Sequence, residues 1–108
     1  MSRDSTRPLH HWSAVELSRA YRAGALSPVE AAQAVIERIE RWEPQLQATY
    51  LYRPEAALEQ ARASEARWRR GEPLGPLDGV PGTLKENIAT AGDPMPAGTA
   101  AVEPRPAA

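Results

Sequence analysis

Apolar residues recur at intervals of three and four positions near the start of the chain, directly after a helix-capping signal. Ser13 is followed three residues later by Glu16, a pair in which each side chain can bond to the other residue's backbone N–H. The apolar stripe that follows consists of Leu17, Ala20 and Tyr21. Gly24 is a typical helix stop, because glycine accepts the left-handed conformation found there. The pattern predicts an amphipathic helix over residues 14–23.

The same pattern returns over a longer stretch. Ser27 and Glu30 form a second capping box, with a proline at the first helical position, where a missing N–H costs nothing. The apolar residues that line one face are Val29, Ala32, Val35, Ile36, Ile39 and Trp42. Because Pro44 cannot donate the next helical hydrogen bond, the pattern predicts a helix over residues 28–42 that ends before this proline.

Weaker patterns occupy the rest of the chain. An alanine- and arginine-rich stretch, stopped by Gly71, predicts a third helix over residues 54–70. Apolar and β-prone residues predict short strands over 48–52 and 79–84. Residues 1–11 are polar and mixed, and we predict that they form a flexible N-terminal arm.

The composition adds one constraint to this picture. Of the 108 residues 42% are hydrophobic, but 20 are alanine, only 17 are Leu, Ile or Val, and none is Phe. Alanine buries little surface, whereas a fully buried large aliphatic side chain contributes about 1.5–3 kcal/mol. The tryptophans, Trp12, Trp42 and Trp68, are expected to act as packing anchors. Helices so poor in large aliphatic residues are expected to pack against further structure, which indicates part of a larger domain.

The net charge, the absence of cysteine, the histidine spacing and the lack of a long apolar stretch exclude several classes of function. The formal net charge is −1, so no strong field favours nucleic acid or an anionic membrane, and we interpret the basic cluster 67–70 as a solvated helix end. The chain has no cysteine, and the adjacent His10 and His11 lack the spacing of a helical metal pair. No stretch approaches the roughly 20 apolar residues of a membrane span. We predict a soluble cytoplasmic protein without a metal or cofactor, and without nucleic-acid or membrane partners.

Lys85 is the candidate for chemistry. It directly follows the apolar stretch Val80–Leu84 and begins the sequence Lys-Glu-Asn. A lysine at the end of a buried strand lies in a low dielectric, which lowers its pKa and allows it to act as a general base. The alternative is a solvated surface lysine, which is the commoner case for a single lysine near a turn.

The wider context of Lys85 favours the catalytic interpretation. The stretch 75–99, GPLDGVPGTLKENIATAGDPMPAGT, resembles the first catalytic segment of the amidase signature family. The shared features are a Gly-Pro-Leu turn, a Gly-Val-Pro strand start, a few apolar residues, Lys-Glu and a glycine-containing loop. The order of the capped helices upstream is also similar. The resemblance runs from about residue 13 to residue 99 and would cover only the first part of a family member.

This resemblance implies an α/β fold, of which residues 12–108 would be the N-terminal portion, with helices and the first strand or strands of a mixed sheet. It also implies hydrolysis of carbon–nitrogen bonds by a Ser–cis-Ser–Lys triad. In such a triad a neutral lysine takes a proton through a bridging serine from a nucleophilic serine, and backbone N–H groups hold the oxyanion. Lys85 matches the lysine of the triad, and it is the only catalytic residue carried over.

The chain departs from the family pattern in three ways. Gly82 stands where a bulky apolar residue is usual, and Glu86 replaces the more common aspartate. The third departure concerns the nucleophile, because the serines lie only at positions 2, 5, 13, 18, 27 and 64, all before Lys85. A base without its nucleophile and oxyanion donors performs no acyl transfer, so the chain alone is expected to be inactive.

Three functions remain open from the sequence. The first is an amidase-family hydrolase that acts on a small-molecule amide, present here as an N-terminal fragment. Lys-Glu-Asn and the loop around Met95 slightly favour it over the second, a fragment similar to the A-subunit of glutamyl-tRNA amidotransferase. The third is a helical docking module without enzymatic activity. The sequence gives no indication of the oligomeric state.

Overall fold

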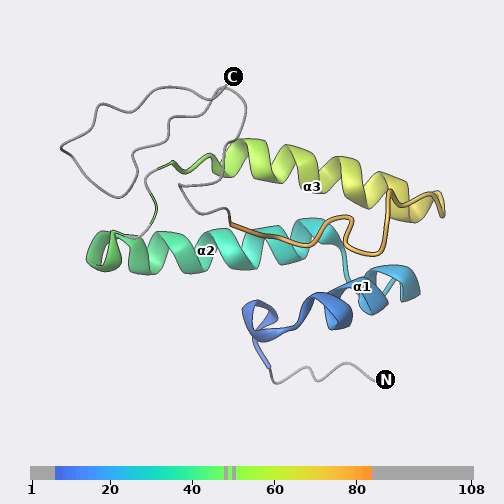
Figure 1. Ribbon diagram of the computed structural model, residues 1–108, viewed down its shortest axis with the longest axis horizontal. Helices are drawn as coiled ribbons and strands as arrows, with labels where there is room; N and C mark the ends of the chain where they lie inside the picture. The colour runs from blue at the N-terminus through green and yellow to red at the C-terminus, as the bar shows by residue number, and fades with distance from the viewer. Residues whose placement is uncertain (1–6, 48, 50, 84–108) are drawn as a thin grey trace.

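The computed structural model describes residues 7–47, 49 and 51–83, and these residues form a helical assembly (Figure 1). Its elements are a 3₁₀ helix η1 (Leu9–His11) and the helices α1 (Ala14–Ala23), α2 (Pro28–Leu46) and α3 (Pro54–Arg69). α2 and α3 pack side by side and run in opposite directions, with α1 near the start of α2. After α3 the chain turns and folds back along the helices, as the orange segment of Figure 1 shows.

Local capping explains where α1 and α2 begin. The Ser13 hydroxyl accepts a hydrogen bond from the N–H of Glu16 at 3.1 Å, and the Glu16 carboxylate accepts from the N–H of Ser13 at 3.0 Å. At α2 the Ser27 hydroxyl accepts from the N–H of Val29, and Glu30 accepts from the N–H of Ser27. Each capping box satisfies N–H groups that have no partner within the helix. Both predicted helix starts are therefore confirmed.

The predicted end of the second helix was wrong, because α2 continues through Pro44 to Leu46. A proline removes one N–H and crowds the preceding turn, but only two helical residues follow it here, so little helix is disturbed. The end of α2 is also held by polar contacts. Gln47 donates its N–H to the carbonyl of Glu43 at 2.8 Å, and the Glu43 carboxylate accepts from the N–H and the hydroxyl of Thr49 at 2.7 and 2.9 Å.

Neither predicted strand is present among the described residues. Thr49 follows the end of α2 with its N–H bound by a side chain, and residues 51–53 lead directly into α3. Positions 79–83 have no strand pairing, and the remaining predicted positions, 48, 50 and 84, lie outside the described residues. An apolar stretch becomes a strand only beside a neighbouring strand that satisfies its backbone groups. The described part of the chain is thus helical, without the strands expected for an α/β fold.

The buried core is small and rich in alanine. It consists of Leu17, Ala20, Tyr21, Leu26 and Ala31, with Leu9, Trp12, Trp68 and Val80 packed against it. The predicted stripe of α1 is buried, whereas Val35, Ile36 and Ile39 of α2 are only half-buried. The low number of large aliphatic residues is therefore reflected in a small core. The longest helix, α2, keeps part of its apolar face accessible to solvent.

The described part of the predicted N-terminal arm makes specific contacts. Leu9–His11 form η1, and Leu9 packs against the core. Arg7 forms an ion pair with Glu16, and the Trp12 indole N–H donates to the carbonyl of Arg7 at 3.2 Å. These contacts were not predictable from the sequence, because no periodic pattern marks them.

The turn after α3 approaches the helices so closely that one position admits no side chain. Val80 donates its N–H to the carbonyl of Leu77 at 3.0 Å, and Gly79 in this turn has a φ of +84°. A Cβ at Gly79 would overlap the hydroxyl of Ser64 and lie 2.8 Å from Cβ and Cγ of Pro28. Glycine is required here both for its backbone conformation and for the space that it leaves.

Gly79→Ala is therefore expected to destabilise the folded chain by about 2–4 kcal/mol, since the left-handed conformation and the steric overlap each cost on the order of 1–2 kcal/mol. The urea midpoint, followed by near-UV circular dichroism of the tryptophans, measures the loss. Gly82→Ala is the matched control, because Gly82 is exposed and a Cβ there meets no atom within 4 Å in the described structure. Equal midpoints for the two variants would contradict the close approach at Gly79.

Candidate functional site

Lys85, the predicted general base, lies outside the described residues. The structure does describe the chain up to Thr83, and it shows how the residues just before the lysine are held. We call residues 74–80 the docked turn. Within it Asp78 donates its N–H to the carbonyl of Gly75 at 3.2 Å, and Val80 donates to Leu77, so that two tight turns follow each other.

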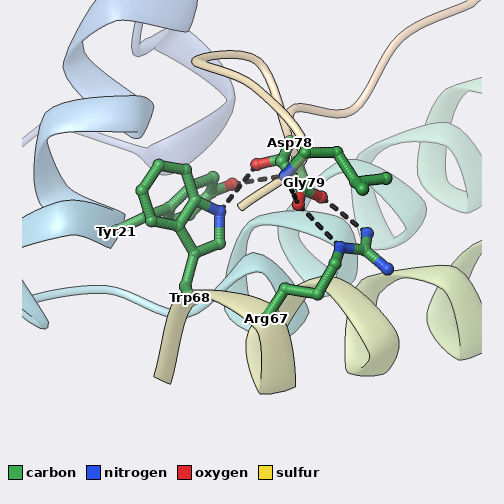
Figure 2. Close-up of polar contacts among 6 residues, drawn as sticks. Tyr21, Arg67, Trp68, Asp78 and Gly79 are labelled. Atoms are coloured by element: carbon green, nitrogen blue, oxygen red, sulfur yellow. Dashed lines mark hydrogen bonds and ion pairs between the residues drawn. The ribbon is translucent and has the colours of Figure 1, made fainter. Parts of the chain in front are cut away.

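The side chain of Asp78 fastens the docked turn to α3 (Figure 2). Arg67 donates from Nε to one carboxylate oxygen at 2.7 Å and from Nη2 to the other at 2.6 Å. The N–H of Leu74 donates to the same carboxylate at 2.9 Å. The Asp78 side chain is only 3% exposed and that of Arg67 is 24% exposed. This is a two-point guanidinium–carboxylate contact largely shielded from water, the geometry in which such a pair is strongest.

The negative charge of Asp78 is stabilised by the groups that donate hydrogen bonds to its carboxylate. The Arg67 guanidinium, and after it the Leu74 N–H, lower the pKa of Asp78 well below its ordinary range, while burial acts in the opposite direction. The same contact raises the pKa of Arg67. The Ser64 hydroxyl lies near enough to Asp78 to lower its pKa further, although it forms no hydrogen bond of normal geometry with the described residues. Asp78 is therefore ionised throughout the neutral and mildly acidic range.

Two further side chains bind the backbone of the docked turn. The Trp68 indole N–H donates to the carbonyl of Asp78 at 2.9 Å, and the Tyr21 hydroxyl donates to the carbonyl of Gly79 at 2.9 Å. Burial raises the pKa of Tyr21 to about 12, so its hydroxyl keeps the proton that it donates. Tyr21 comes from α1 and Trp68 from α3, and their ring centres lie 6.0 Å apart. We call Tyr21, Arg67, Trp68 and Asp78 the anchor cluster.

The role of Arg67 was not predicted from the sequence. The interpretation of the basic cluster 67–70 as a solvated helix end holds for the exposed Arg69 and Arg70. Arg67 points instead toward Asp78, eleven residues later in the chain. Asp78 is the single acidic residue in an otherwise apolar turn, and this could have marked it in the sequence. Its partner, Arg67, is not recognisable from sequence spacing alone.

The other sequence-predicted features have limited chemical roles here. Ser13 and Ser27 cap helices, and Ser27 also donates from its hydroxyl to Glu65. Ser64 is 1% exposed beneath the docked turn, where a substrate carbonyl cannot reach its hydroxyl. Gly82, noted as a departure from the family pattern, is exposed.

Neither a metal site nor a membrane span is found within the described ranges. No group of three or more His, Cys, Asp or Glu side chains in these ranges is placed to hold a metal ion. No helix in them combines the length and apolar character needed to cross a membrane.

The stabilisation that Asp78 provides is expected to depend on pH in the acid range. Because its folded-state pKa lies below the ordinary value of 3.8, the carboxylate stabilises the fold fully above about pH 5 and progressively less as the pH falls toward the folded-state pKa. At pH 7 Asp78→Asn is expected to lower the free energy of unfolding by about 2–3 kcal/mol, less than for a fully buried pair because Arg67 keeps some hydration.

Urea unfolding of the wild type and Asp78→Asn between pH 7 and pH 3 tests this expectation. The difference between the two proteins should shrink below about pH 4. Glu72→Gln removes an exposed carboxylate a few residues away and is the matched control, for which we expect little change. A difference that stays constant down to pH 3 would show that the charge of Asp78 does not stabilise the turn.

Comparisons with known proteins place this arrangement in a family. The family model described as Amidase matches residues 30–108. The A-subunit of glutamyl-tRNA(Gln) amidotransferase from Chloroflexus aggregans is 44% identical over 91 residues, which cover 84% of this chain and 19% of that protein. An indoleacetamide hydrolase from Bradyrhizobium diazoefficiens is 39% identical over 87 residues, which cover 81% of this chain and 17% of that protein.

A solved structure supports the same assignment. The crystal structure of a bacterial aryl acylamidase of the amidase signature family superposes with a TM-score of 0.76 at 35% identity, covering 85% of this chain and 19% of that one. The chain thus spans about a fifth of the length of these relatives. With a family model that matches most of its residues and a solved relative that shares its fold, the chain belongs to the amidase signature family.

Proposed function

We propose that this chain carries the general base of an enzyme that hydrolyses amide carbon–nitrogen bonds, and that Lys85 is this base. The observation that supports the proposal most is the amidase match over residues 30–108, which spans Lys85 and the Lys-Glu-Asn sequence that it begins. Two similar proteins, an indoleacetamide hydrolase and an aryl acylamidase, are named for the cleavage of amides. The proposed substrate is accordingly a small-molecule amide.

In the proposed mechanism Lys85 acts in its uncharged form, which a low dielectric favours by lowering its pKa. A serine oxygen attacks the amide carbonyl carbon, while the serine proton passes through a second serine to Nζ of Lys85. Backbone N–H groups stabilise the oxyanion that forms. The carbon–nitrogen bond then breaks, the amine leaves with the proton, and water hydrolyses the acyl-serine ester to free the acid.

Three serines in the described part of the chain do not suit that mechanism. Ser13 and Ser27 are engaged as helix caps, and Ser64 is enclosed beneath the docked turn. All six serines precede Lys85 in the sequence. We therefore propose that the nucleophile, the bridging serine and the oxyanion donors belong to sequence beyond these 108 residues, which form an N-terminal part of the enzyme.

The 108-residue chain alone is expected to hydrolyse no simple amide, because it supplies a base without a nucleophile. Release of aniline from an anilide, or of ammonia from indoleacetamide, measures this directly. Turnover by the isolated chain that Lys85→Ala abolishes would contradict the proposed division of catalytic groups.

The gene provides the complementary test. The reading frame is expected to continue past Ala108 into a Gly-Ser-Ser-Gly-type loop, and the full-length product is expected to hydrolyse an amide. In that product Lys85→Ala and Lys85→Met should lower kcat by roughly 10²–10⁴-fold with the fold retained, as expected for loss of a general base. Arg70→Gln, at an exposed helix end, is the control expected to keep wild-type rates. A stop codon after Ala108, or full activity without Lys85, would overturn the proposal.

A second candidate is the A-subunit of an amidotransferase, because the 44% identical relative carries that name. The two candidates differ in the fate of the nitrogen released from the amide. In one case the full-length product would release nitrogen from an amide donor, leaving the donor acid, for transfer to the glutamyl group of glutamyl-tRNA(Gln). In the other it would release the acid and amine of a small amide into solution. Assays with both substrates on the same preparation separate them.

A further inference from the structure

We propose that the C-terminal half of α2 carries a docking surface for an acidic segment of a partner protein, formed by Arg38, Arg41 and Trp42. The two guanidinium groups lie over the Trp42 ring, with their Cζ atoms 5.3 and 5.6 Å from its centre. Both arginines are exposed, and Trp42 is half-buried. We call these three residues the basic patch. The inference is independent of the proposed role of Lys85.

The acidic and basic residues in this part of α2 lie on different flanks of the helix. With 3.6 residues per turn, Arg38 and Arg41 fall on one side of the apolar stripe. Glu40 and Glu43 fall on the other side, where they already have partners. The Tyr52 hydroxyl donates to Glu40 at 3.1 Å, and Glu43 accepts from the segment that follows α2. Within the described ranges neither arginine of the basic patch forms an ion pair with a carboxylate.

The Trp42 indole supplies a second, independent observation. Its N–H is covered but donates to no acceptor in the described part of the chain. The indole N–H groups of Trp12 and Trp68, in contrast, each donate to a backbone carbonyl. A covered donor without an acceptor costs free energy, which an oxygen brought by a partner would offset. The arginine side chains over the ring are exposed and flexible, so they can move to admit such an oxygen.

The chemistry of the basic patch fits a carboxylate-bearing protein segment better than nucleic acid. A guanidinium binds a carboxylate through two parallel N–H donors, and Arg and Trp are enriched at the centres of protein interfaces. A phosphate backbone is bound by many cations, whereas this chain has a net charge of −1 and Glu37 lies one turn before Arg41. His10 adds no cation at neutral pH, because burial, and then the charges of His11 and Arg38, lower its pKa.

The exposure of the basic patch indicates a separate partner protein. Interfaces that stay permanently buried are more apolar than those that form and separate. The half-buried apolar residues of α2, such as Val35 and Ile39, suit contact with more of the same domain. The exposed arginines beside them suit a partner that binds through charge.

The indole N–H resonance of Trp42 in the ¹⁵N-labelled chain measures this docking, and Trp42→Phe identifies the resonance by its loss. The probe is acetyl-hexaglutamate amide at low ionic strength, since salt screens exposed ion pairs. We expect the peptide to shift the Trp42 resonance in a saturable way and to leave that of Trp68 unchanged. Acetyl-hexaglutamine amide, which has the same length without the charge, should cause no shift.

Arg38→Gln and Arg41→Gln should each weaken the binding of hexaglutamate about three- to fivefold, as expected for the loss of an exposed ion pair, and the double variant should weaken it further. Arg19→Gln removes an exposed cation from α1 and is the matched control, expected to keep the wild-type affinity. Near-UV circular dichroism shows that each variant stays folded.

Absence of a shift with hexaglutamate, or an unchanged affinity in the folded double variant, would overturn the proposal. Binding of the RNA hexamer hexauridylate at least as tightly as hexaglutamate would assign the basic patch to nucleic acid and overturn it as well. So would a full-length product in which the Trp42 resonance no longer responds to the peptide, because the rest of that enzyme would then cover the basic patch.

Discussion

A carboxylate shielded from water must be matched by hydrogen-bond donors, and the donors of Asp78 lie in two different segments of the chain. Arg67 comes from the last turns of α3, whereas the Leu74 N–H comes from the loop that follows. A buried ion pair that loses one partner leaves the other charge uncompensated, so the arrangement tolerates few alternatives. The path of the described chain after α3 depends on this contact.

Polar contacts contribute much of the stability of this assembly because the chain has few large aliphatic residues. The core is built largely from alanine with few large aliphatic side chains, and the apolar face of α2 is only half-buried. Small side chains let α2 and α3 pack closely but remove little apolar surface from water. In such an assembly one well-matched charge pair and two side-chain hydrogen bonds to carbonyls decide whether a turn stays docked. The half-buried face of α2 is typical of a helix that packs against more of a domain, in keeping with relatives of which this chain spans about a fifth.

What could be predicted from the sequence was local. The capping boxes of Ser13 and Ser27 involve residues three positions apart, and both helix starts follow from them. The end of α2 was misjudged because the cost of Pro44 depends on how much helix follows it. The strand predicted over 79–84 failed in its described part because pairing needs a neighbouring strand, which no local pattern supplies. The Arg67–Asp78 contact and the steric need for Gly79 depend on how α3 and the turn meet in space. Lys85 was predicted from its motif and lies outside the described residues.

The most direct test of this account is the nuclear magnetic resonance spectrum of the indole N–H groups together with the Overhauser contacts of Gly79. If the docked turn is held as described, the Trp68 indole proton exchanges slowly with solvent, and the Tyr21 ring shows contacts to the α-protons of Gly79. A Trp68 indole proton that exchanges at the rate of an exposed tryptophan, with no contact between Tyr21 and Gly79, would show that the turn is not docked on α1 and α3.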